Sequence, residues 1–362
     1  MFLSLFIFLA VIGANVIVSV YIERKLSAFI QDRLGPMEVG KWGLLQLFAD
    51  LLKLFQKEDI IPDKADKKLF MFAPYLIFIA IFAGFAFIPV NRLLQGADLQ
   101  TGVFLLMGII SLDILGILMA GWSSNNKYAL LGSMRSVAQI LSYEVPIGLS
   151  VLCVVLISSS LNIQEIITQQ GIFSGEANYL FGIKALGIET TRIGGFLTWN
   201  IFRSPFLLIA FVVFIIAALA EANRAPFDLP EAESELIAGF HTEYSGFRWA
   251  ILFLAEYGMM LLLSMFAVVL FLGGWNTPFP NIGSLKLADW TSGKNSEIAT
   301  HLWGAFWLFS KAYLGMLVQM WIRWTLPRMR VDQLMYLCWK VLTPLSLILV
   351  LISAFWRILM IW

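Results

Sequence analysis

Residues 221–246 read EANRAPFDLPEAESELIAGFHTEYSG, and this stretch lies between two strongly apolar runs, near 205–220 and 249–272. It carries six carboxylates and one arginine. Charged side chains are costly close to lipid, and those retained there usually have a function. The stretch therefore predicts two membrane helices joined by a polar connection that does more than link them.

The composition of the whole chain agrees with this prediction. Of its 362 residues, 59% are hydrophobic and only 14% are charged, against about 25% charged in soluble domains. The formal net charge of +1 argues against a nucleic-acid-binding protein, which would carry a basic patch or stripe. We therefore predict an all-α integral membrane protein that forms a single polytopic domain, 1–362.

Apolar stretches long enough to cross about 30 Å of hydrocarbon as helices recur eight times. The first is not a cleavable signal peptide, because it lacks a basic start and a small-residue cleavage site. The eight predicted spans lie near 2–22, 70–90, 103–121, 145–161, 205–220, 249–272, 303–322 and 341–361.

The distribution of basic residues predicts the orientation. The odd-numbered connections between spans hold 17 of the 25 lysines and arginines. The positive-inside rule then places these connections in the cytoplasm or an organelle matrix, and both termini on the other side. The predicted cytoplasmic connections are about 23–69, 122–144, 221–248 and 323–340.

One segment of the first connection, LLQLFADLLKLFQKED from Leu44 to Asp59, has apolar residues at helical spacing and a polar stripe opposite. It is too short to span the bilayer, so we predict an amphipathic helix in the membrane interface. Two roles stay open for this helix. It either anchors the connection or forms a gate over an opening toward the lipid.

The acidic connection combines Pro226 and Pro230 with the alternating acids Glu231, Glu233 and Glu235. Crowded carboxylates disfavour ionising together, so some of their pKa values should rise. Groups that share protons in this way are suited to a proton relay. The alternative is a solvated acidic loop, but the apolar residues between the acids favour partial burial.

Four charged residues in or beside the predicted spans are candidates for a function. Glu144 either stabilises the first turn of a helix or carries protons in the protein interior. Asp113, Glu256 and Lys311 lie within spans, where charged residues usually face the bundle interior and pair. A structural ion pair of Lys311 with one of these acids and a role in transport are equally compatible with the sequence.

Ligands for a metal or redox centre are scarce. Cys153 and Cys338 are isolated, and His241 and His301 lie in different connections. These residues form no CxxC, CxxCH or zinc spacing, and the placement of the histidines argues against haem. We expect no metal site and no redox centre in this chain.

Several motifs together resemble one known family. They occur in order along the chain and cover all four cytoplasmic connections. The blocks are ERK at Glu23–Lys25, QDRLGP at Gln31–Pro36, GLLQLFADLLKLFQKED at Gly43–Asp59, Trp122–Pro146, Glu221–Gly246, and WIRWTLPRMRVDQLM at Trp321–Met335. This pattern resembles the quinone-channel membrane subunit of respiratory complex I, the NuoH or mitochondrial ND-one type. The connection 162–204 matches the family least, so no role is carried over to it.

The resemblance implies a subunit of the proton-translocating NADH:quinone oxidoreductase. Such a subunit encloses a tunnel through which quinone (ubiquinone or menaquinone) leaves the bilayer, and it couples quinone reduction to proton translocation through a carboxylate cluster. Quinone is its substrate, whereas NADH, FMN and the iron–sulfur clusters are expected in partner subunits. The implied partners are the quinone-site and terminal iron–sulfur subunits of the peripheral arm, other membrane-arm subunits and the lipid membrane, with no nucleic acid.

The resemblance also implies three groups of site residues, by matching motif positions. The proton relay comprises Glu144, Glu221, Asp228, Glu231, Glu233, Glu235, Glu243 and Glu256. The quinone tunnel comprises Arg24, Arg33, Asp50, Lys53, Arg224 and Phe227. Docking of the peripheral arm involves Arg323, Arg328, Arg330 and Asp332.

Two alternative functions remain at this point. The membrane subunit of an energy-converting hydrogenase shares the fold and parts of the acidic loop, but the extended RAPFDLPEAESELIAGF match favours complex I. A stand-alone ion transporter often shows internal repeats and broken helices, and we detect neither in the sequence. The resemblance favours the bacterial cytoplasmic (inner) membrane, with an organelle inner membrane as the alternative.

Overall fold

The structure, a computed structural model, describes residues 2–361 except 92–93, 173, 175–177, 184–186, 230–236, 282–285 and 293–296. The described part of the chain is helical, and its one β-type contact is an isolated bridge between Tyr179 and Glu189. The all-α prediction is therefore confirmed.

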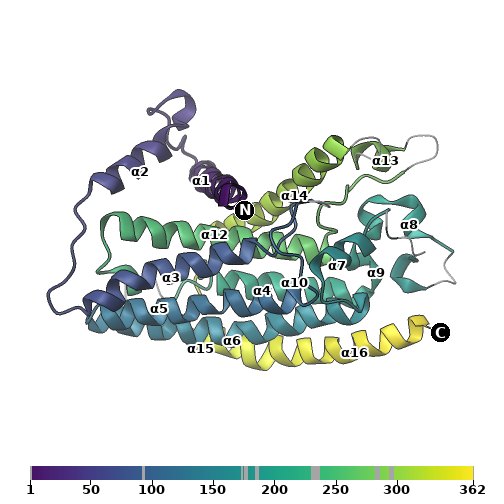
Figure 1. Cartoon of the computed structure of the whole chain (residues 1–362). Coiled ribbons are helices and arrows are strands. Elements are labelled where there is room, and N and C mark those ends of the chain that lie inside the picture. The colour runs from purple at the N-terminus through teal and green to yellow at the C-terminus, as the bar shows by residue number, and fades with distance from the viewer. Residues whose placement is uncertain are drawn as a thin grey trace.

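Five helices make up the body of the molecule. In Figure 1 they run roughly parallel to one another across the view. The helix α12 is buried along nearly all of its length and packs against α3 and α10, while α5 lies between α3 and α6. The five are α3 (Lys67–Phe85), α5 (Leu112–Ser123), α6 (Lys127–Ser158), α10 (Pro205–Glu221) and α12 (Gly246–Phe271).

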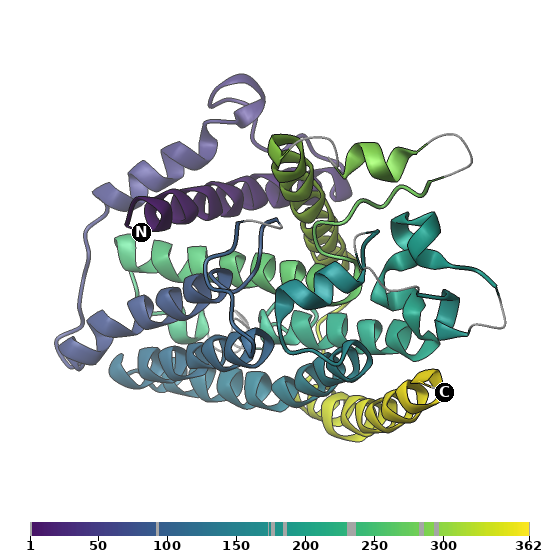
Figure 2. The same ribbon diagram turned by 45° about the vertical axis from the view of Figure 1, so that its right-hand side comes forward.

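Three helices cover one side of this body. The helices α1 (Phe2–Ile30) and α14 (Glu297–Thr325) pack against α12 and against each other. The short helix α2 (Gln46–Gln56) contacts α1 and α12, and Figures 1 and 2 show it projecting from the bundle. The predicted amphipathic segment thus forms a helix, and it has apolar residues on both its covered and its outer side.

The opposite face is covered by the C-terminal helices. The helix α15 (Val331–Tyr336) continues through a π-helical turn, Leu337–Leu342, into α16 (Thr343–Ile361). The helix α16 packs on α6, and both views show it along the lower edge of the bundle.

Short helices gather at the end of the bundle far from α2. They include α7 (Ile163–Gln169), α8 (Thr190–Ile193), α9 (Asn200–Arg203) and α13 (Leu287–Thr291). Figure 1 shows them grouped around the C-terminal end of α12. The described part of the connection 162–204, to which the sequence analysis assigned no function, therefore folds as a compact cover of that end.

Each of the eight predicted spans falls largely within helical sequence. Among the described residues, five segments are long and apolar enough to cross a membrane, and α10 is apolar but shorter. A multi-pass membrane protein is thus supported, while the number of eight crossings stays a prediction. The five segments are Lys67–Phe85, Gly102–Ser123, Lys127–Ser158, Gly246–Phe271 and Val331–Leu359.

Two boundaries differ from the sequence prediction. The span 103–121 consists of α4 (Gly102–Ile110) and α5, which meet at Ser111. The connection 122–144 is mostly helix, because α6 begins at Lys127, where the Asn126 side chain accepts a hydrogen bond from the Tyr128 backbone N–H. Hydropathy marks where polar residues give way to apolar ones, whereas the capping residue determines where a helix begins.

Candidate functional site

A large apolar cavity has a volume of about 800 Å³ and lies between α1, α2, α3, α12 and residues 237–246. Apolar side chains dominate its lining, among them Val20, Leu47, Phe78 and Phe253. Leu47 is buried, whereas Phe48 on the same helix is 56% exposed. The helix α2 therefore covers the cavity with one apolar side and presents another outward.

Charged side chains reach this cavity from two helices. The helix α1 contributes Arg24, and α2 contributes Asp50 and Lys53. Arg24 Nη1 lies 2.5 Å from Asp50 Oδ2, and the Gln46 amide donates to the other oxygen of Asp50 at 3.0 Å. This ion pair holds α2 to α1 across the cavity wall. Three of the residues expected for the tunnel thus line one cavity.

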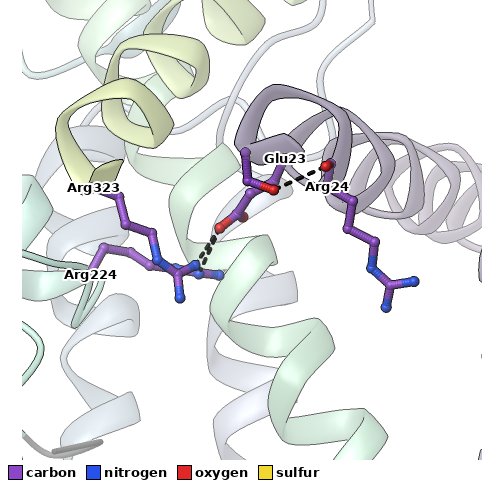
Figure 3. A network of polar contacts seen from close by, with 5 residues as sticks. Glu23, Arg24, Arg224 and Arg323 are labelled. Carbon is purple, nitrogen blue, oxygen red and sulfur yellow. Dashed lines mark hydrogen bonds and ion pairs between the residues drawn. The ribbon is translucent and has the colours of Figure 1, made fainter. Parts of the chain in front are cut away.

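A second polar cluster lies behind the first, where Glu23 faces two arginines. Arg224 Nη1 is 3.5 Å from Glu23 Oε1, and Arg323 pairs with the same oxygen. Figure 3 shows both arginines converging on the Glu23 carboxylate, while the neighbouring Arg24 points away from it. The Arg224 guanidinium also lies 4.3 Å from the centroid of the Tyr257 ring. Glu23 and Arg224 are both buried, so their charges depend on this pairing.

The third feature is a small pocket that is lined by three acids. Its volume of about 20 Å³ is enough for one water molecule. Asp113 of α5, Glu221 at the end of α10 and Glu256 of α12 all line it. Glu144 on α6 is half-buried and close enough to interact electrostatically with Glu221. These four acids come from four different helices and form a continuous set.

His241 lies between the large cavity and the acidic pocket. Its side chain lines both, and its Nε2 is 2.9 Å from Glu256 Oε1. No role was predicted for His241 from the sequence, where its placement only argued against haem. The available signal was its place in the acidic connection, where apolar neighbours indicated burial.

Gln139 on α6 fixes the chain that follows α10. Its amide donates to the carbonyl oxygens of Ala220 at 2.7 Å and Phe227 at 2.8 Å. The ring of Phe227 packs against Tyr143, with 5.5 Å between centroids. Phe227 and Arg224 were expected at the tunnel, but neither is among the residues that line the large cavity. Their contacts hold the acidic connection against α1, α6 and α12.

The remaining acids of this connection differ in their surroundings. Asp228 forms an ion pair with Arg328 at 2.8 Å. Burial raises the pKa of the Asp228 carboxyl, and the positive charge of Arg328 offsets part of that rise. Glu243 accepts a hydrogen bond from the Asn126 amide at 2.6 Å. The predicted relay acids Glu231, Glu233 and Glu235 lie outside the described residues.

The residues expected for docking divide into two kinds. Arg323 turns inward to Glu23, so its charge is used within the subunit. Arg330 and Asp332 are exposed at the start of α15, and Arg328 is 37% exposed. The tunnel candidate Arg33 is also exposed, beside a groove that it shares with Arg24. Arg330 and Asp332 are therefore the candidates that face outward.

The structure excludes one structural interpretation of Lys311 and one of Glu144. Lys311 forms no ion pair with Asp113 or Glu256, all three being described residues, because its ammonium group donates to the carbonyl oxygens of Leu272 and Asn276 at 2.7 and 2.9 Å. Glu144 lies well inside α6, so it does not serve a first helical turn.

Within the described part of the chain, no group of three or more His, Cys, Asp and Glu residues is placed to hold a metal ion. Cys153 and Cys338 are both buried and free.

Comparison with known proteins gives matches along nearly the whole chain. The family model described as "NADH dehydrogenase" matches residues 3–354. An H-type subunit of the NADH-quinone oxidoreductase of Cytophaga hutchinsonii, the one numbered 2, is 59% identical over 360 residues, which cover 98% of each chain. The corresponding H-type subunit of Chlorobaculum parvum is 51% identical over 339 residues, covering 94% of this chain and 87% of the relative. That of Bacteroides fragilis is 41% identical over 355 residues, covering 96% and 90%.

Proposed function

Because this chain belongs to the family of H-type subunits of NADH-quinone oxidoreductase, and is thus a membrane subunit of respiratory complex I, we propose that its large cavity admits quinone and that its buried acids couple quinone reduction to proton translocation. The observation that carries this proposal is the position of the apolar cavity directly beside the pocket of Asp113, Glu221 and Glu256.

The cavity has the properties that a quinone tunnel requires. Its volume of about 800 Å³ is within the range of about 300–1,000 Å³ typical of ligand pockets, which are mostly apolar with a few polar groups. An isoprenoid tail would lie against side chains such as Leu47, Phe78 and Phe253. The exposed apolar residues of α2 would place its outer side in the membrane interface. This arrangement favours entry of a lipid-soluble substrate beside α2.

The acids supply a way to transmit charge. Quinone reduction takes up two electrons and two protons, and the electrons would come from partner subunits. A charge that appears in the cavity acts strongly on nearby acids, because the protein interior has a low dielectric constant. Interacting acids titrate as a group, so a change beside Glu256 redistributes protons among Asp113, Glu221 and Glu144. The four acids would in this way pass the redox event to proton pathways of the membrane arm.

The proposal includes the surroundings of the subunit. Arg330 and Asp332, exposed at the start of α15, would contact the peripheral arm, whose subunits would carry the NADH site, FMN and iron–sulfur clusters. The match to proteins of bacteria such as Cytophaga hutchinsonii favours the bacterial cytoplasmic membrane as the location.

The test replaces Glu221 and Glu144 one at a time by glutamine in the assembled complex. We expect quinone reduction and proton pumping to fall at least about tenfold, because a well-placed proton-transfer group contributes about 10²–10⁴-fold. Reduction of an artificial acceptor that bypasses quinone reports whether the peripheral arm is still attached and active. Glu165→Gln, at an exposed acid at the far end, is the matched control. Full turnover and pumping in both variants would overturn the proposal.

The same assay on Glu233→Gln and Glu235→Gln tests the acids outside the described residues. We expect these substitutions to lower quinone-linked activity more than they lower assembly.

A further inference from the structure

We propose that His241 is the proton-transfer residue that connects the large cavity to the buried acidic pocket. The inference rests on the proposed function and deepens it, because it names the side chain through which the quinone cavity and the acids communicate. His241 is the residue that lines both spaces and also binds one of the acids directly, through the 2.9 Å contact of Nε2 with Glu256.

The backbone holds His241 in a fixed position. It ends the short turn Gly239–His241, in which Gly239 has a φ of 56°. This turn lies so close to α6 that a Cβ added at Gly132 would be 2.8 Å from Gly239 Cα. The Thr242 hydroxyl donates to the Gly239 carbonyl at 2.7 Å, and the Tyr244 N–H donates to the His241 carbonyl at 3.1 Å. The imidazole therefore stays in the wall between the two spaces.

Imidazole suits this position because it can accept a proton at one ring nitrogen and release another from the second. The O–H bond of a protonated Glu256 breaks as a bond forms between that proton and His241 Nε2. The N–H bond at the other ring nitrogen then breaks, and an O–H bond forms on the reduced quinone, directly or through water. Glu256 is left ionised and His241 is neutral again, so one proton has crossed the wall.

Other charged and titratable groups face the same region and contribute to its response to pH. They come from the elements that line the two spaces. They are Glu256 of α12, Glu221 of α10, Asp113 of α5, Arg24 of α1, Asp50, Lys53 and Lys57 of α2, Tyr75 of α3, and Tyr244 of the same connection.

The test compares His241→Gln and His241→Ala in membranes that contain the whole complex. We expect both variants to reduce the artificial acceptor normally and to reduce quinone at least about tenfold more slowly. This loss should be smaller than the 10²–10⁴-fold that a proton-transfer group can contribute, because water can replace part of the path. The pH dependence of quinone reduction should also differ from that of wild type. His301→Gln, at the other histidine of the chain, should leave both the rate and the pH profile unchanged.

Chemical rescue separates proton transfer from a purely structural role. The cavity beside His241→Ala has room for added imidazole, and we expect imidazole to restore quinone reduction. With a series of substituted imidazoles, the restored rate should follow the basicity of the added base. Equal rescue by bases of different basicity, or by apolar molecules of the same size, would show that His241 only fills space and would overturn the inference.

A parallel Glu256→Gln variant keeps the two proposals distinguishable. If Glu256→Gln loses activity while His241→Gln retains full activity and the normal pH profile, the inference about His241 is wrong and the proposed function stands. If Glu256→Gln, Glu221→Gln and His241→Gln all retain full turnover and pumping, the proposed coupling itself is wrong.

Discussion

The two halves of α12 are both surrounded by buried polar side chains, but those side chains bind different partners. At the C-terminal end, Gln170, Asn200 and Lys311 donate to the carbonyl oxygens of Val269, Leu270 and Leu272. Near the N-terminal half, charged and titratable side chains bind one another, as in the Glu23 cluster and the contact of His241 with Glu256.

This difference separates structural polarity from functional polarity. The last carbonyl groups of a helix have no partner within the helix, so the side chains at the C-terminal end of α12 supply hydrogen bonds that the backbone needs. The side chains near the N-terminal half bind one another and do not serve the backbone in this way, and burying charged groups costs free energy. Among them, His241 borders both cavities and Glu256 borders the acidic pocket, whereas Gln170, Asn200 and Lys311 line neither. The free-energy cost of burying charged side chains near the N-terminal half of α12 therefore points to a function.

The largest expected effect comes from Glu23→Gln. It removes the buried carboxylate that Arg224 and Arg323 both face, and breaking a buried pair costs about 3–5 kcal/mol. We expect the amount of assembled complex and its thermal stability to fall sharply. Native gels and thermal unfolding of membranes measure both quantities.

Glu38→Gln, at an exposed acid of the same connection, is the control and should behave as wild type. Normal assembly and stability of Glu23→Gln would show that the cluster is not held by charge pairing, and the contrast between the two halves of α12 would weaken.

Lys311→Met tests the far end. The substitution keeps much of the side-chain length but leaves two carbonyl oxygens without a donor, at about 1–3 kcal/mol for each unsatisfied group. We expect lower thermal stability with an unchanged quinone turnover per assembled complex. Lys340→Met, at an exposed lysine, is the control. Normal stability combined with lost proton pumping would assign a function to the far end and break the comparison.

Much of the fold follows from local sequence. The apolar runs predicted α3, α12 and the other long helices, and helical spacing predicted α2, because a helix is determined mainly by its own periodicity. The start of α6 was misplaced, since its first turns are polar on one side and are recognised from the cap at Asn126. The cover formed by the described part of 162–204 could not be predicted, because its short helices α7 and α9 depend on packing against α12.

The candidate site was predictable in part. Arg24 and Asp50 were assigned to one tunnel from motifs, and the structure brings them together. The position of Arg323 could not be predicted, because its partner Glu23 is 300 residues away in sequence and only packing joins them. His241 was missed because a single histidine in a connection carries no pattern until its two neighbouring cavities are seen.

Tyr244→Phe sharpens the comparison with a smaller effect. Its hydroxyl donates to the Phe70 carbonyl oxygen at 3.3 Å. This contact from a side chain to the backbone is of the kind found at the C-terminal end of α12, but it lies near the N-terminal half. Burial raises the pKa of Tyr244 to about 12, against about 10 for an ordinary tyrosine, so the phenol is neutral at every physiological pH. We expect a stability loss of about 1 kcal/mol and a pH profile of turnover between 6 and 9 that matches wild type.

The effect of Tyr244 on the pH dependence of stability can also be measured. Because the folded chain keeps a proton that the unfolded chain loses near pH 10, wild-type stability should fall between about pH 10 and 12 more than that of Tyr244→Phe. A change in turnover below pH 9 would instead place this hydroxyl in the proton path.

Arg328→Gln has the smallest expected effect, because its partly exposed ion pair with Asp228 is worth about 1 kcal/mol or less. Its pH dependence is nevertheless specific. Burial raises the pKa of Asp228, and Arg328 opposes that rise, so the substitution raises the pKa further. Ionised Asp228 then lacks its ion-pair partner, and the variant should be less stable than wild type at pH 8 but nearly equal to it at low pH, where Asp228 is protonated in both.

The control for this prediction is the double variant Arg328→Gln with Asp228→Asn. It has no carboxylate to ionise at that position, so the extra loss of stability at pH 8 should disappear. If the double variant loses as much stability at pH 8 as Arg328→Gln alone, the Arg328 side chain acts through packing. The charge pairing that distinguishes the near end of α12 would then stop at the Glu23 cluster and not extend to the start of α15.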